Sequence, residues 1–91
     1  MFSYQLSKKL LKKTNKLLSK DPVLADILDK KIDEISSRNE KSINMYKNLH
    51  SPQHEYKRVH LTSNFVLLFH VDSNQKHIIF TDILHWDVAY K

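Results

Sequence analysis

The chain has 91 residues, a length that supports a single modest hydrophobic core, and we expect one domain over residues 1–91. It has no cysteine, which excludes disulfides and thiolate metal sites. It has neither a signal-peptide pattern nor an apolar run near the roughly 20 residues of a membrane span. We therefore expect a cytoplasmic protein without a membrane partner. Its formal net charge is +5, and residues 1–20 hold six lysines and no acid; this favours a polyanionic partner such as nucleic acid, although a solvated helix face gives the same pattern.

The N-terminal third predicts a strand and two helices. Residues 2–7 alternate apolar and polar side chains, which is typical of a short half-buried strand. A helix over about 7–19 follows with Ser7 as its N-cap, and we expect its leucines to form one apolar stripe (Leu10, Leu11, Leu17 and Leu18). Asp21 as N-cap and Pro22 at the first helical position begin a second helix that runs to about Ser37.

Residues 38–53 form a polar connection, which we expect Ile43, Met45 and Tyr46 to hold against the body of the protein. Three strand-like runs follow at 55–61, 65–71 and 77–84. The run at 65–71 is almost continuously apolar, so we expect it to be the central strand.

The turns between these strands contain Asn64 and Asn74, which we expect to adopt positive φ because the chain has no glycine. The order of elements predicts an α+β fold. It consists of an N-terminal strand, a helical hairpin, a three-strand antiparallel meander and a short C-terminal tail, with both helices on one face of an antiparallel sheet.

Strand alternation sorts the side chains of residues 55–61. Val59 and Leu61 would face the core, and Tyr56, Arg58 and His60 would then project from the open face of the sheet. These three could also be ordinary exposed strand residues.

The C-terminal segment adds a second histidine. His85 follows the last predicted strand, and we expect His60, His85, Arg58 and Tyr90 to surround one site. Two imidazoles and a guanidinium suit phosphodiester chemistry, in which one histidine takes a proton, the other gives a proton, and the arginine stabilises charge on the phosphate.

Other chemistries have less support in the residue spacing. The pairs His54/His60 and His70/His77 lack zinc-like spacing, and we expect neither a metal nor a cofactor. Without glycine there is no Gly-rich phosphate loop, and no spacing supports a Ser-His-Asp triad. Asp82 and Asp87 either orient an imidazole or only cap the last turn.

The segment "YKRVHLTSNFVLLFHVDSNQKHIIFTDILHWDVAY" (56–90) resembles the C-terminal half of the RelE/ParE toxin superfamily of prokaryotic toxin–antitoxin modules. The shared signs are a basic strand with Arg-x-His, an aromatic–aliphatic strand, a hairpin and a terminal His-x-x-x-x-Tyr. The N-terminal strand and the lysine-rich helices match the family's order. Many RelE members have Tyr-Arg where this chain has Phe65–Val66, so the pattern is closer to the histidine-rich YafQ branch, in which an Asp stands at the position of Asn64.

The resemblance implies a ribosome-dependent mRNA endonuclease, in which a 2′-hydroxyl attacks the adjacent phosphate and leaves a cyclic phosphate and a 5′-hydroxyl. His85 and His60 would be the general base and acid in either order, with Arg58 on the active-site strand and Tyr90 positioning a base. The expected RNA- and phosphate-binding residues are Lys57, Tyr56, Asn64, Lys9, Lys13 and Lys16. The implied partners are a small RelB-like antitoxin, the ribosome and mRNA.

Two alternatives stay open. A ParE-like inhibitor of DNA gyrase would share the fold, but it has no need of paired imidazoles. A non-catalytic co-repressor that acts only with its antitoxin would fit the missing Tyr-Arg pair and Asn64.

Overall fold

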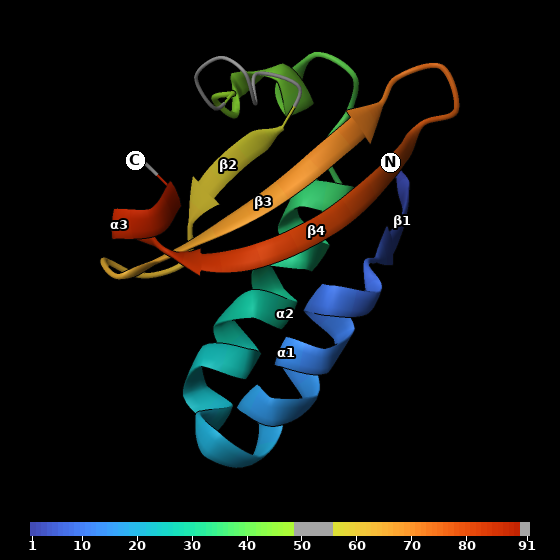
Figure 1. The fold of residues 1–91 in the computed structure, drawn as a ribbon. Coiled ribbons are helices and arrows are strands. Elements are labelled where there is room, and N and C mark those ends of the chain that lie inside the picture. The colour runs from blue at the N-terminus through green and yellow to red at the C-terminus, as the bar shows by residue number, and fades with distance from the viewer. Residues whose placement is uncertain (49–55, 90–91) are drawn as a thin grey trace.

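The computed structural model describes residues 1–48 and 56–89, which form four strands and three α-helices together with one short 3₁₀-helix (Figure 1). In chain order these elements are β1 (Ser3–Leu6), α1 (Lys8–Lys20), α2 (Pro22–Ser36), η1 (Ser42–Met45), β2 (Lys57–His60), β3 (Phe65–Asp72), β4 (His77–His85) and α3 (Trp86–Ala89). The predicted α+β class and element order are confirmed. The expected tail contains the single turn α3, and Tyr90 lies outside the described residues. Among the described helices, none is long and apolar enough to cross a membrane.

Both predicted helix starts are confirmed by their caps. The Ser7 hydroxyl accepts a hydrogen bond from the backbone N–H of Leu10 at 3.1 Å. The Asp21 carboxylate accepts one from the N–H of Leu24 at 3.1 Å, with Pro22 in the first turn of α2. Each side chain thus pairs an N–H that the helix itself cannot satisfy.

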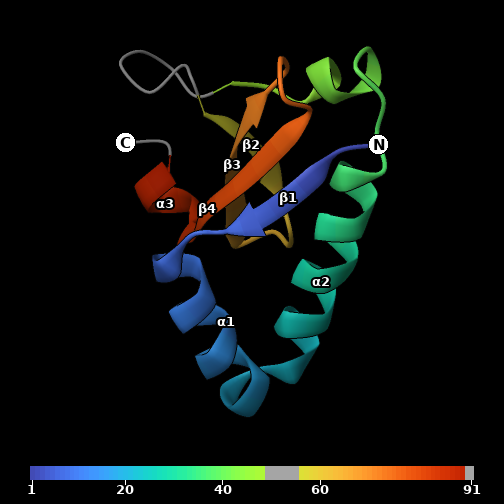
Figure 2. The same ribbon diagram turned by 90° about the vertical axis from the view of Figure 1, so that its right-hand side faces the viewer.

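The sheet is mixed, with the strand order β1-β4-β3-β2. The meander β2-β3-β4 is antiparallel, whereas β1 pairs with β4 in parallel. Figure 2 shows β1 beside β4, with the helical hairpin carrying the chain away from β1 before it returns at β2. The expected all-antiparallel sheet is therefore wrong at β1, because no hairpin turn constrains the direction of a strand that a helical crossover connects to the rest.

One face of the sheet is buried by the helices, and its core includes Leu10, Leu28, Leu67, Phe69 and Phe80. Leu17 packs against this core, but Leu11 and Leu18 are exposed. The expected four-leucine stripe is therefore wrong. A spacing of seven keeps Leu10 over Leu17, but adjacent residues point about 100° apart on a helix.

The connection after α2 is held by Ile43 and Tyr46, whereas Met45 is exposed, contrary to the prediction. The Tyr46 ring packs edge-on against Phe69 at 5.6 Å, and its hydroxyl donates to Glu34 at 2.6 Å. This hydrogen bond is the main reason that the pKa of Glu34 lies below its ordinary value, with nearby cations adding to the effect.

The β-hairpin turns differ from the prediction in their backbone. Within the described residues, Lys76 has the positive φ, at 52°, and neither Asn64 nor Asn74 does. The Asp72 carboxylate accepts hydrogen bonds from the N–H groups of Asn74 and Gln75. Asp72 therefore organises the start of the β3–β4 turn, and the left-handed residue falls at its end.

Candidate active site

The two faces of β2 separate as predicted. Val59 pairs with Leu67 and packs against the core with Leu61. Arg58 and His60 pair with Leu68 and Val66 and therefore lie on the open face. The ring of Tyr56 meets the ring of His70 edge-on at 6.3 Å.

His85 is the last residue of β4 and pairs with Phe65 across the sheet. The two rings meet edge-on at 5.7 Å. His60 pairs with Val66, the next residue of β3. Because neighbouring residues of a strand point to opposite faces, His60 and His85 lie on opposite faces of the sheet.

The expectation that His60, His85 and Arg58 surround one site is therefore corrected by the register. Alternation in the sequence predicted which side chains of β2 share a face, but it could not predict the register in which β3 pairs with β4. Tyr90, the fourth expected member, lies outside the described residues, and its role stays a prediction.

The His85 imidazole is held by the residues that follow it. Its Nδ1 lies 3.5 Å from an Asp87 carboxylate oxygen, and the Asp87 backbone N–H donates to Nδ1 at 3.4 Å. The Trp86 ring stacks on the imidazole at 6.5 Å. The two contacts belong to different states of the ring, because an unprotonated Nδ1 accepts from the N–H and a protonated Nδ1 donates to the carboxylate. In both states Nε2 is the nitrogen that could exchange a proton with a substrate.

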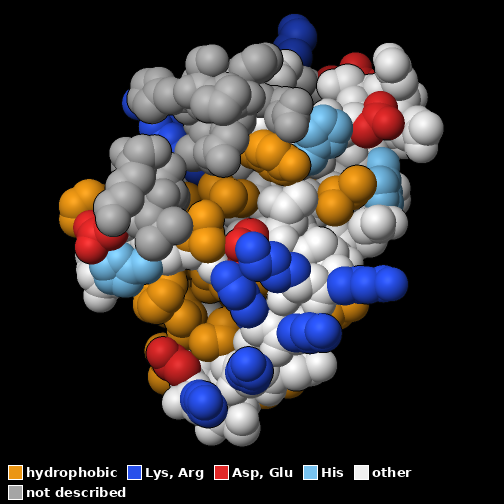
Figure 3. Space-filling view, viewed as in Figure 1, with side chains coloured by type: hydrophobic (Ala, Val, Ile, Leu, Met, Phe, Trp, Pro, Cys, Tyr) orange, Lys and Arg blue, Asp and Glu red, His pale blue; other side chains and the backbone are white. Residues whose placement is uncertain are grey.

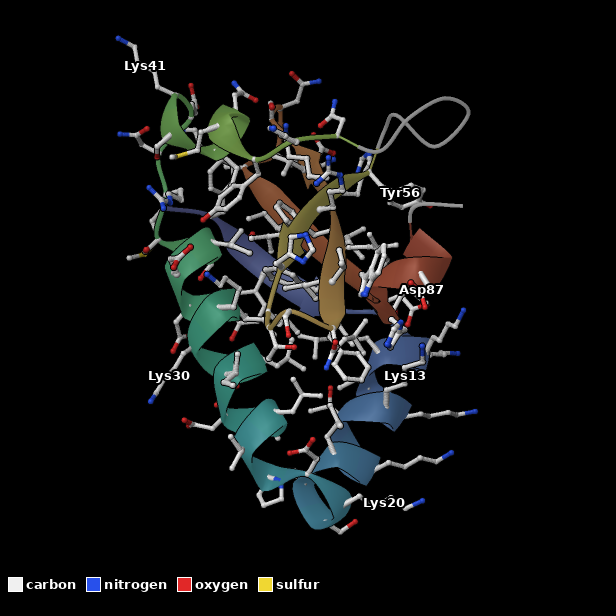
Figure 4. All side chains as sticks on the ribbon, turned by 90° about the vertical axis from the view of Figure 1, so that its left-hand side faces the viewer. Lys13, Lys20, Lys30, Lys41, Tyr56 and Asp87 are labelled. Atoms are coloured by element: carbon white, nitrogen blue, oxygen red, sulfur yellow. The ribbon has the colours of Figure 1, made fainter. Side chains whose placement is uncertain are left out.

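A buried carboxylate joins α1 to β4. Asp82 is only 7% exposed; it accepts a hydrogen bond from the ammonium group of Lys13 at 2.6 Å and forms an ion pair with that of Lys9 at 3.2 Å. The Lys13 ammonium also donates to the backbone carbonyl of Ile83 at 2.9 Å. Lys and Arg side chains gather over α1 in Figure 3, and in Figure 4 the lysines of α1 project from the side of the molecule on which Asp87 lies. Two of the three α1 lysines predicted to bind RNA, Lys9 and Lys13, are thus tethered to the sheet.

A cavity of about 330 Å³, here called the hairpin cavity, opens where α1 and α2 meet the ends of β3 and β4. Its walls are mostly apolar, and its charged or titratable members are Lys13, Lys16 and His85. The apolar members are Leu17, Leu24, Phe65, Ile83 and Leu84. The cavity therefore places His85 beside two lysines and an apolar surface.

The remaining predicted residues have other surroundings. The Lys57 ammonium donates to the carbonyl of Tyr46 at 3.2 Å and to Asn48 at 3.0 Å, and burial lowers the pKa of Lys57. The backbone carbonyl of Asn64 accepts a hydrogen bond from the backbone N–H of Trp86 at 2.9 Å, and this contact helps to position the start of α3. Where the chain is described, no three His, Cys, Asp or Glu side chains gather as metal ligands.

The sequence interpretation missed Asp82 as the partner of the lysines, and it missed the hairpin cavity. One signal for Asp82 was present, because a carboxylate inside the apolar run "HIIFTDIL" is rarely buried unless it is paired. No local pattern marks the cavity, since its walls come from four elements.

The sequence matches no protein-family model. The fold superposes on YafQ from Escherichia coli strain BL21(DE3) with a TM-score of 0.73, at 14% identity over all of both chains. It also superposes on one chain of the toxin–antitoxin complex RelBE2 from Mycobacterium tuberculosis with a TM-score of 0.68, at 12% identity, covering 92% of this chain and 96% of that chain. The fold is therefore that of the small toxins of toxin–antitoxin modules.

Sequence similarity assigns the family. The toxin candidate RelE4 of Methanocaldococcus jannaschii is 37% identical over 91 residues, which make up all of this chain and 93% of that protein. The chain belongs to the RelE/ParE toxin superfamily, and the resemblance carried by residues 56–90 is confirmed.

Proposed function

We propose that this protein is the toxin of a type II toxin–antitoxin module and that it cleaves mRNA on the ribosome. The observation that carries the proposal is His85, an imidazole anchored at Nδ1 beside a cavity with two lysines. Membership of the RelE/ParE superfamily and the net charge of +5 support a ribonucleoprotein target.

The proposed reaction is an intramolecular phosphoryl transfer within RNA. The 2′-oxygen forms a bond to the adjacent phosphorus, the bond from phosphorus to the 5′-oxygen breaks, and the products are a 2′,3′-cyclic phosphate and a 5′-hydroxyl. One proton leaves the 2′-hydroxyl and one is delivered to the 5′-oxygen. His85 Nε2 carries out one of these transfers, and the other exchanges with solvent, because His60 lies on the opposite face.

The residues that would contact RNA divide into three groups in this proposal. Lys13 and Lys16 stabilise the charge that develops on the phosphate beside His85. Arg58 and His60, with Tyr56, bind RNA backbone on the open face as a second contact. Tyr90 keeps its predicted role in positioning a base.

The proposed partner in the absence of the ribosome is a small RelB-like antitoxin. A RelBE2 toxin–antitoxin complex is among the structures with this fold, and a chain of net charge +5 favours an acidic partner segment. We place the protein in the cytoplasm, where ribosomes are found, and treat residues 1–91 as one domain.

The test measures translation and mRNA cleavage when the chain is expressed alone and with its antitoxin. His85→Ala should lower the single-turnover cleavage rate by about 10² to 10⁴-fold, the range for general acid–base catalysis. His77→Ala is the matched control. It removes an imidazole from the other end of β4, where His77 hydrogen-bonds Ser3 at 2.8 Å and does not line the hairpin cavity, so the cleavage rate should be unchanged. Full cleavage by the His85 variant would refute the catalytic role, and gyrase inhibition without RNA cleavage would establish the ParE-like alternative.

A further inference from the structure

We propose that the hairpin cavity binds one unpaired nucleotide, with the base among its apolar side chains and the phosphate at Lys13 and Lys16. The inference deepens the proposed function and rests on it, since it names the part of the RNA that this surface takes. It concerns binding and does not depend on which residue performs proton transfer.

The walls of the cavity suit a nucleobase. Leu24 and Ile83 are buried, and Leu17 and Phe65 are partly buried against the core, so packing holds these side chains in place. A volume of about 330 Å³ lies at the lower end of the range for ligand sites, which fits one base with its ribose rather than a larger ligand. Proteins that bind single-stranded RNA accept splayed bases on apolar and aromatic surfaces of this kind.

The rim of the cavity suits a phosphate. Lys13 and Lys16 are three residues apart on α1 and therefore lie on one helix face. Contacts with Asp82 and with the carbonyl of Ile83 hold the Lys13 ammonium, and these use two of its three N–H donors. One donor of a positioned cation is left to meet a phosphate oxygen.

The local charge balance favours an anion. Lys9, Lys13 and Lys16 contribute three positive charges near this rim, and Asp82 neutralises one. An uncharged apolar ligand would make no use of the two remaining charges, whereas a nucleotide satisfies both the rim and the apolar wall. A second hollow of about 250 Å³ meets the cavity at Leu24 and Phe65. It adds the polar side chains of Thr62 and Asn64 and the carboxylate of Asp21, which caps α2 by accepting from the N–H of Leu24.

The position of His85 connects the proposed nucleotide site to the proposed cleavage reaction. His85 lines the same cavity, and its ring meets the Phe65 ring at 5.7 Å. A nucleotide with its base on Phe65 and its phosphate at the lysines would therefore hold that phosphate beside the imidazole. In this arrangement the captured base positions the phosphate that is cleaved.

The experiment uses the full chain and a 2′-O-methyl trinucleotide that cannot be cleaved, with 2-aminopurine as its central base. A matched trinucleotide has an abasic central residue. Binding is followed by 2-aminopurine fluorescence and, for both probes, by calorimetry. The base should strengthen binding by about 5- to 150-fold, the range for one base stacked on a protein surface.

Two tryptophan variants test the location. Leu17→Trp fills the cavity and should remove the difference between the two probes. Leu18→Trp adds the same side chain to an exposed position one residue away, and should leave that difference unchanged. Should Leu17→Trp fail to fold, Lys16→Gln takes its place. It should weaken both probes equally and lower the salt slope of binding by about 0.7, the value for one phosphate contact on a single strand.

Equal affinity for the base-containing and abasic probes would overturn the inference. It would also be overturned if Leu17→Trp kept the base preference but lost the antitoxin, since the cavity would then take an apolar side chain of a protein partner. Because the probes are bound without ribosomes and without cleavage, failure of mRNA cleavage in cells would refute the proposed function and leave this subsite standing.

Discussion

Asp82→Asn tests the link between α1 and β4, the contact that positions Lys13. The substitution keeps the shape of the side chain and removes its charge. Asp82 is 7% exposed, whereas the side chains of Lys9 and Lys13 are 68% and 36% exposed, so both ammonium groups can regain water. Breaking a fully buried ion pair costs about 3–5 kcal/mol, and this access to solvent reduces the expected loss to about 1–2 kcal/mol. For a domain of this size, that loss lowers Tm by about 5–15 °C.

The assay is thermal and urea unfolding of Asp82→Asn, Lys13→Gln and the double variant. The double-mutant cycle should give a coupling energy of about 1 kcal/mol, because the 2.6 Å contact is lost in each single variant. Asp26→Asn is the control. Its pair with Lys30 is exposed, so the substitution should cost no more than about 0.5 kcal/mol. An Asp82→Asn protein as stable as the parent, or additive behaviour in the cycle, would refute the view that this carboxylate fixes Lys13.

Three further outcomes follow from other contacts. Tyr46→Phe should lower the free energy of unfolding by about 1 kcal/mol at pH 7. Because the pKa of Glu34 is lower in the folded state, its ionised carboxylate stabilises the fold above about pH 4.5, and this contribution is lost as pH falls through the folded-state pKa. In urea unfolding between pH 3 and 7, the free energy of unfolding should therefore fall less steeply with decreasing pH in the variant than in the parent. Lys16→Gln should weaken ribosome binding more than Lys9→Gln, since Lys16 lines the hairpin cavity, whereas Lys9 does not line it and is ion-paired with Asp82 at 3.2 Å; equal losses in a sedimentation assay would contradict this. Lys57→Met should lower Tm and leave the affinity for RNA unchanged, because the Lys57 ammonium holds the preceding chain; a selective loss of affinity would restore its predicted phosphate contact.

Elements with local signals could be predicted correctly from the amino-acid sequence. Ser7 and Asp21 begin their helices because a side chain next to the first turn pairs an N–H only three residues away. The alternation in β2 correctly separated Val59 from Arg58 and His60, since a period of two is a property of one strand. The family was also recognisable, because the motifs of residues 56–90 are contiguous in the chain.

Contacts between segments that lie far apart in the chain could not be predicted from the sequence and are seen only in the folded protein. The parallel pairing of β1 with β4 and the ion pair between Lys13 and Asp82 join residues about 70 positions apart. The register of β3 placed His60 and His85 on opposite faces, where an offset of one residue would have put them on the same face. Such pairings depend on how whole apolar faces fit together in three dimensions, so the free energy that selects them is not encoded in any short stretch of sequence.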